Sequence, residues 1–133
     1  MDSSAARLLR GFLEPCLLSL LAEHADYGLS LAQRLAAGGL DEVPGGTLYP
    51  ALMRLEKRGL VAVSWRPSTS GPARKYYELT DAGHTELATR RAEWRSFSAA
   101  VGALIEGQTH GGPLMSRFEE ARAVKPDTTA DWY

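Results

Sequence analysis

Cysteine is almost absent from this sequence, which has Cys16 as its single thiol among 133 residues. One cysteine cannot form an intramolecular disulfide or complete a cysteine-rich zinc site, so a secreted disulfide scaffold is excluded and a reducing compartment is favoured. Cys16 lies at an apolar position of a predicted helix, which predicts a buried and inert thiol, with a redox switch as the alternative.

Long apolar runs are missing as well. The longest stretch, residues 12–22, is interrupted by Glu14, Pro15 and Ser19, and a membrane span needs ~20 apolar residues. No basic segment of the signal-peptide type precedes it. We therefore expect a cytoplasmic protein with no membrane partner.

The sequence also lacks the residue groups that most enzymes and metal sites use. His24, His84 and His110 are isolated, no His-x-x-x-His or Cys-x-x-Cys pair occurs, and no glycine-rich phosphate loop follows a predicted strand. We expect no catalytic activity, no cofactor and no metal.

Positive and negative charges nearly balance over the whole sequence, but they are unevenly distributed along it. The net charge is −1, but residues 47–80 contain six basic and two acidic side chains, whereas residues 1–46 contain three basic and six acidic ones. The total thus conceals a basic block of net charge +4. A solvated basic surface is the simple explanation of such a block, and a nucleic-acid partner is the other.

Apolar periodicity predicts helices before this block and within it. Leucines and other apolar residues recur three and four apart from Leu13 to His24, then at Leu31 and Leu35, and again from Leu48 to Leu55. The second helix is predicted to end at Gly38-Gly39, and the third to cover residues 46–58 with Gly59 as a left-handed cap. Residues 3–10 form a further helical turn in this prediction. Pro50 is expected in the first turn of the third helix, where a missing N–H costs little.

A hairpin and a long helix follow in the prediction. Residues 60–65 and 75–80 are β-rich and are separated by a turn-forming segment at 67–72. Thr80 then resembles a helix N-cap for a segment that stays helix-compatible to Gly107, about 40 Å at ~1.5 Å per residue. The chain from residue 108 to 133 is a polar tail, with at most a short helix near residues 114–122. The fold class is thus mainly α with a small β-hairpin.

The order of these elements is that of a winged helix-turn-helix, and the residues at many positions resemble those of the PadR family of transcriptional regulators. Arg10-Gly11 and Tyr27-Gly28 contribute to the resemblance, which covers residues 8–107. The positions that carry most of it are Gly46, Thr47, Leu48, Tyr49, Pro50, Ala51, Leu52, Arg54, Leu55, Glu56, Gly59, Leu60, Val61, Gly71, Pro72, Arg74, Lys75, Tyr76, Tyr77, Leu79, Thr80 and Gly83. The resemblance implies a DNA-binding domain over residues 1–80 and a dimerisation helix over 81–107.

The candidate DNA-binding residues lie on the third helix and the hairpin: Thr47, Tyr49, Pro50, Arg54, Lys57, Arg74 and Lys75. Polar groups at a helix N-terminus suit phosphates or base edges, and Arg54 is long enough for a guanine edge. The alternatives are packing of Tyr49 under the wing and a surface ion pair for Arg54. Tyr76 and Tyr77 must point to opposite faces of their strand, so one of them belongs to the core.

The long helix carries an apolar stripe, from which Leu87, Trp94, Phe97 and Val101 are the candidate dimer or effector contacts. Seventy residues cannot cover a stripe of this length, so a second subunit is expected, joined through this helix and the N-terminal helix. In some relatives a tryptophan at the place of Trp94 stacks flat aromatic effectors; ordinary packing between subunits is the alternative. The prediction is a homodimeric repressor on a pseudo-palindromic operator, released by a planar aromatic effector. A winged helix used only for protein contacts is the competing hypothesis.

Overall fold

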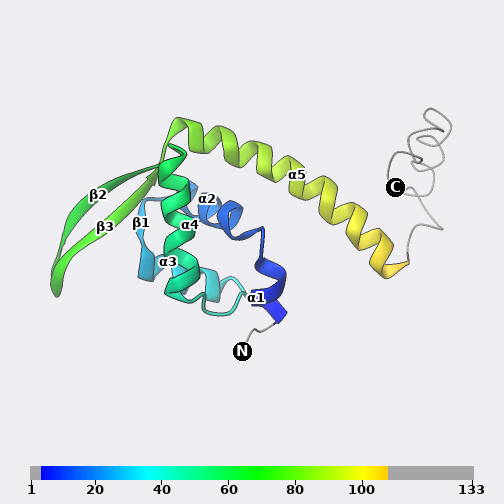
Figure 1. The fold of residues 1–133 in the computed structure, drawn as a ribbon, viewed down its shortest axis with the longest axis horizontal. Helices are drawn as coiled ribbons and strands as arrows, with labels where there is room; N and C mark the ends of the chain where they lie inside the picture. Colours follow the sequence, from blue (N-terminus) through cyan, green and yellow to red (C-terminus); the bar gives the residue numbers. More distant parts are fainter. Residues whose placement is uncertain (1–3, 108–133) are drawn as a thin grey trace. The chain divides into compact units, whose positions relative to one another are not determined.

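The computed structural model describes residues 4–107. The helices are α1 (Ser4–Leu9), α2 (Leu13–Glu23), α3 (Gly28–Ala37), α4 (Gly45–Lys57) and α5 (Asp81–Glu106), and the strands are β1 (Asp26–Tyr27), β2 (Val61–Ser68) and β3 (Gly71–Leu79). The predicted class, mainly helical with a small sheet and a long C-terminal helix, is confirmed (Figure 1). The short helix expected near residues 114–122 lies outside the described residues.

The chain forms two compact units, of which the first ends at Ala92, so that α5 begins in the first unit and continues into the second. The core of the first unit is built from leucines on α2, α3 and α4. Six of them are less than 2 % exposed: Leu17, Leu18, Leu31, Leu48, Leu52 and Leu55. A spacing of three or four, which places side chains on one face, is seen in the buried leucines of each helix: Leu13, Leu17 and Leu21 of α2, Leu31 and Leu35 of α3, and Leu48, Leu52 and Leu55 of α4.

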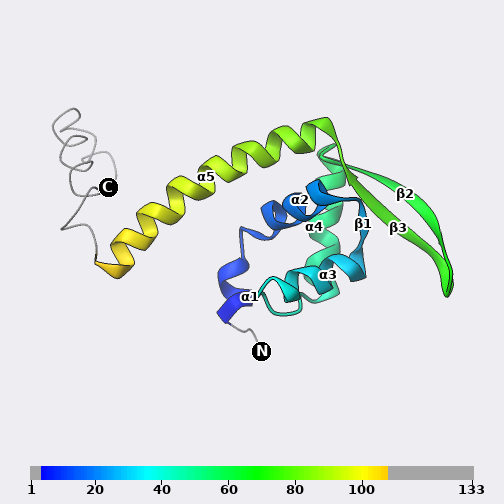
Figure 2. The same ribbon diagram turned by 180° about the vertical axis from the view of Figure 1, so that it is seen from behind.

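The strands form an antiparallel sheet in the order β1-β3-β2 (Figure 2). β1 is not among the elements predicted from the sequence. β1 pairs Asp26 with Tyr77 and Tyr27 with Tyr76. Two residues are too few for an alternation pattern to be visible in a sequence.

The hairpin strands are longer than predicted and leave only Thr69 and Ser70 between them. Pro67 lies inside β2, where the pairing register shifts between Arg66 and Ser68. A proline donates no ladder hydrogen bond and is accommodated at an edge or a bulge. Four residues of the segment predicted to form the turn, Pro67, Ser68, Gly71 and Pro72, therefore belong to the strands.

The prediction that Pro50 lies in the first turn of α4 is wrong: the helix begins at Gly45, and Pro50 is its sixth residue. A proline there removes the hydrogen bond that would reach the carbonyl of Gly46, four residues earlier. Gly46 is exposed, so water can bind this carbonyl. The cost of Pro50 is thus reduced by the open position of the first turn.

Thr80 caps α5 as predicted and also joins it to the end of α4. The backbone N–H of Gly83 donates to the Thr80 hydroxyl oxygen at 3.0 Å, and that hydroxyl donates to the carbonyl of Gly59 at 2.7 Å. Gly59 has a φ of +74°, the left-handed conformation that favours glycine at a helix end. One side chain therefore fixes the start of α5 against the turn between α4 and the wing.

Candidate nucleic-acid interface

α4 presents the predicted binding residues at the surface because its apolar side is buried. Leu48, Ala51, Leu52 and Leu55 are 0–2 % exposed. The other side of the helix faces outward, and all five candidate residues of the helix are exposed: Thr47, Tyr49, Pro50, Arg54 and Lys57. Lys57 makes no ion pair with any residue of the described part of the chain.

Tyr49 lies between α4 and the start of α3. A Cβ atom on Gly28 would lie 2.5 Å from the Tyr49 hydroxyl oxygen and from a ring carbon, so the ring closely approaches the Gly28 backbone. The side chain is nevertheless 45 % exposed. Tyr49 therefore packs against the start of α3 on one edge and remains accessible on the other.

The wing carries its cations over tyrosine rings. The Arg74 guanidinium lies 4.4 Å from the ring centre of Tyr27, and that of Arg66 lies 4.3 Å from the ring centre of Tyr76. The two rings are themselves 5.3 Å apart. Arg66 and Arg74 face each other across β2 and β3, and the attraction between a cation and an aromatic face helps to hold two like charges on one sheet face.

The other face of the sheet holds Lys75 and Tyr77. Tyr77 is 2 % exposed, which confirms that one of the paired tyrosines belongs to the core. Burial, and after it the negative charge of Glu56, raises the pKa of Tyr77, so its phenol stays protonated. The Lys75 ammonium lies 3.6 Å from a Glu56 carboxylate oxygen.

Arg54 is held by an acidic residue of α2. Its Nε donates to a Glu14 carboxylate oxygen at 2.8 Å, and the other oxygen of Glu14 lies 3.9 Å from Arg58. Arg58 continues the chain of charges to Glu86 at 3.5 Å, which also accepts a 2.8 Å hydrogen bond from Arg90. The Arg90 bond and the charge of Arg58 lower the pKa of Glu86. The surface ion pair considered for Arg54 is thus present in the structure.

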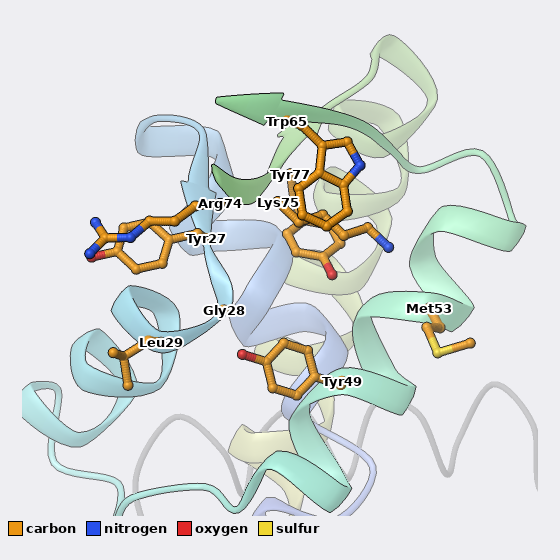
Figure 3. A pocket seen from close by; sticks show the side chains of 9 residues that line it. All are labelled: Tyr27, Gly28, Leu29, Tyr49, Met53, Trp65, Arg74, Lys75 and Tyr77. Atoms are coloured by element: carbon orange, nitrogen blue, oxygen red, sulfur yellow. The ribbon is translucent and has the colours of Figure 1, made fainter. Parts of the chain in front are cut away.

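An open groove of about 450 Å³ lies between α4 and the wing. Figure 3 shows Arg74 along the ring of Tyr27 at one side, and Trp65, Lys75 and Tyr77 gathered opposite Tyr49. Met53 of α4 and Trp65 of β2 line the groove and are 61 % and 67 % exposed. Neither residue is among the candidates predicted from the sequence, because large apolar residues are normally assigned to the core.

The apolar stripe of α5 is divided. Leu87 is 3 % exposed and belongs to the core of the first unit, so the expectation that it contacts a partner or an effector is wrong: its own domain covers it. Farther along the helix Trp94 and Phe97 are half exposed, Val101 is partly buried, and Leu104 and Ile105 are 70 % and 78 % exposed. The exposed side chains of the stripe thus lie in this later part of α5.

Within residues 4–107 no helix combines the length and apolar character needed to cross a membrane. In the same part of the chain no three acidic, histidine or cysteine side chains converge as a metal site. The candidate sites of the described chain are the α4 surface, the wing and the later part of α5.

Three helices followed by an antiparallel hairpin define a winged helix-turn-helix domain. The model of the transcriptional regulator PadR-like family matches residues 17–89. The chain is 37% identical to the transcriptional regulator Rv3488 of Mycobacterium tuberculosis over 67% of this chain and 78% of that protein.

Solved structures agree with this match. A PadR family transcriptional regulator from Eggerthella lenta is 40% identical, with a TM-score of 0.67 over 75% of this chain and 87% of that one. A PadR-like regulator from Bacillus cereus is 34% identical, with a TM-score of 0.67 over 74% and 96%. The chain belongs to the PadR-like family of transcriptional regulators.

Proposed function

We propose that this protein acts in the cytoplasm as a homodimeric repressor that binds a pseudo-palindromic operator through α4 and the wing. The observation that carries the proposal is the joint exposure of Thr47, Tyr49 and Lys57 on α4, beside a wing that holds Arg74 and Lys75. Helix N-termini and cations bind phosphates, and an α-helix fits the major groove. Two such helices in a dimer would enter successive major grooves about 34 Å apart.

The ion pair between Arg54 and Glu14 is compatible with this role. Arg54 is 57 % exposed in its side chain, and an exposed pair of this kind contributes about 0–1 kcal/mol. A well-placed arginine contact with guanine contributes about 1–3 kcal/mol. DNA therefore competes favourably with Glu14 for the Arg54 guanidinium.

The test of DNA binding is an operator-shift assay on duplexes selected from genomic fragments. Arg54→Ala and Arg74→Ala should each weaken binding by about 5- to 150-fold, the fold-change for a lost contact of about 1–3 kcal/mol. Arg91→Ala is the matched control, because it removes the same charge from α5, where the guanidinium lies 3.2 Å from Ser19 of α2. Equal affinity in all four proteins would contradict the assignment of Arg54 and Arg74.

The competing hypothesis, a winged helix used only for protein contacts, predicts that no duplex is selected at all. The exposed basic residues of α4 and the wing favour DNA instead, since a surface of this charge suits phosphates. Selection of a specific duplex by the wild-type protein would exclude the competing hypothesis.

We further propose that a planar aromatic effector releases the repressor by binding beside Trp94 in the dimer. Trp94 is 50 % exposed, and two such indoles related by a two-fold axis offer aromatic surface to both faces of a flat ligand. Quenching of Trp94 fluorescence by compounds that also release DNA, lost in Trp94→Leu, would support this site. If releasing compounds act equally on Trp94→Leu, Trp94 contributes only to subunit packing.

A further inference from the structure

The outermost side of α4 is apolar where the helix would enter the major groove. Gly46, Pro50, Met53 and Lys57 are spaced four, three and four apart, opposite the buried leucines, and all four are exposed. Arg54 lies toward α2, where Glu14 holds it. Over the first nine residues of α4, the most protruding side therefore has no group that forms side-chain hydrogen bonds.

Met53 is the side chain with the longest reach on this part of the helix. It is 61 % exposed, and Trp65 of β2, 67 % exposed, lines the same groove, so an apolar surface continues from α4 to the wing. Figure 3 shows the Met53 side chain extending from α4, apart from Tyr49 and Trp65. An unbranched thioether adapts its shape to an irregular surface.

The chemistry of the major groove limits what such a side chain recognises. Each base pair presents donors and acceptors there, and the single apolar group is the 5-methyl of thymine. Gly46 has no side chain and Pro50 only a compact ring, so the helix can approach the bases closely. We propose that Met53 reads a thymine methyl group in each half-site, and thereby selects an A·T pair at that position. This inference rests on the proposed function.

The experiment removes single methyl groups from the DNA. In a duplex selected by the wild-type protein, each thymine is replaced in turn by deoxyuridine, which lacks only the 5-methyl group. Dissociation constants are measured for the wild type, Met53→Ala, Met53→Leu and Met53→Gln. All four should fold alike, because the side chain is exposed; circular dichroism and thermal unfolding check this.

At one thymine per half-site, deoxyuridine should weaken wild-type binding about fourfold, the fold-change expected for one buried apolar carbon. Met53→Ala and Met53→Gln should bind the thymine duplex several-fold more weakly and lose sensitivity to deoxyuridine at that position. Met53→Leu should keep most of the affinity and the sensitivity. Thymines outside the half-sites serve as internal controls.

Two results overturn the proposal alone: a selected duplex in which no thymine is sensitive, or a sensitive thymine whose effect is unchanged in Met53→Ala. If the wild-type protein selects no duplex over random competitor, both the inference and the proposed function fail. The two failures are therefore distinguishable.

Discussion

At the scale of single residues, the acid that holds Arg54 offers a direct test of the proposed DNA contact. Glu14 accepts a 2.8 Å hydrogen bond from Arg54 and places a negative charge beside the proposed interface. Glu14→Gln should therefore raise operator affinity by up to about fivefold, the upper range for an exposed ion pair. Fluorescence anisotropy at fixed salt measures the change. A gain of the same size in the Arg54→Ala background would show that the charge of Glu14, and not its hold on Arg54, is responsible.

Cys16 gives a second prediction at this scale. Burial raises the pKa of its thiol, and the thiolate is the reactive form. Alkylation of the folded protein near pH 8 should therefore be much slower than alkylation in concentrated urea. Mass spectrometry over time measures both rates. Equal rates would contradict the inert role and favour the redox alternative.

The sequence predicted the exposed residues of α4 well, because exposure on an amphipathic helix follows from its period. It could not predict that Glu14 would hold Arg54, since the two residues are forty positions apart and their meeting depends on how α2 packs against α4. Met53 was missed for a different reason: the helix period places it opposite the buried leucines, but an exposed apolar side chain does not by itself indicate a binding site.

At the scale of elements, Gly83 links the first turn of α5 to the wing. A Cβ atom there would overlap the carbonyl oxygen of Leu60 and lie 2.6 Å from a methyl carbon of Leu79. Relieving this overlap requires a shift of the backbone at Leu60, so Gly83→Ala should lower the free energy of unfolding by about 1–3 kcal/mol. Gly102→Ala in the same helix meets nothing within 4 Å and should stabilise α5 by up to ~1 kcal/mol. Urea unfolding of both variants compares them; a Gly83→Ala protein as stable as the wild type would contradict the contact.

The junction between β1 and α3 depends on a buried carboxylate. Asp26 is 4 % exposed and accepts hydrogen bonds from Ser30 at 2.7 Å, Arg34 at 3.0 Å and the backbone N–H of Tyr27 at 2.9 Å. Without this carboxylate the Ser30 hydroxyl and the Tyr27 N–H lose their acceptor, whereas Arg34 keeps its ion pair with Glu23 at 2.8 Å. Asp26→Ala should cost about 1–3 kcal/mol of unfolding free energy, whereas Gln33→Ala, on the exposed side of α3, should cost little. Similar urea midpoints for both variants would refute this role.

The helices were predictable because each repeats its apolar residues over two or more turns, whereas β1 has two residues and no repeat. Leu87 shows a different limit. Its position on the α5 stripe follows from the sequence, but the point at which the domain stops covering that stripe depends on tertiary packing. Its 3 % exposure assigns it to the core.

At the scale of the whole molecule, the net charge of −1 is a poor guide to the surface that would meet DNA. The cations of residues 47–80 are concentrated on α4 and the wing, but several of them already have partners, among them Glu14, Glu56 and the ring of Tyr27. Neutral overall charge weakens non-specific attraction to DNA. Binding should therefore depend on matched contacts made by both subunits at once.

The salt dependence of binding tests the dimer directly. If about four cations of each subunit meet phosphates, a dimer neutralises about eight, and log K against log salt should have a slope of roughly −7. Leu104 and Ile105 are 70 % and 78 % exposed, so the double variant Leu104→Glu with Ile105→Glu should separate the subunits without unfolding them. Sedimentation should show a monomer, and its slope should fall to about −3.5. Two results would contradict the prediction that both subunits meet phosphates. One is a monomeric variant that keeps a slope of roughly −7, and the other is a wild-type slope of only about −3.5.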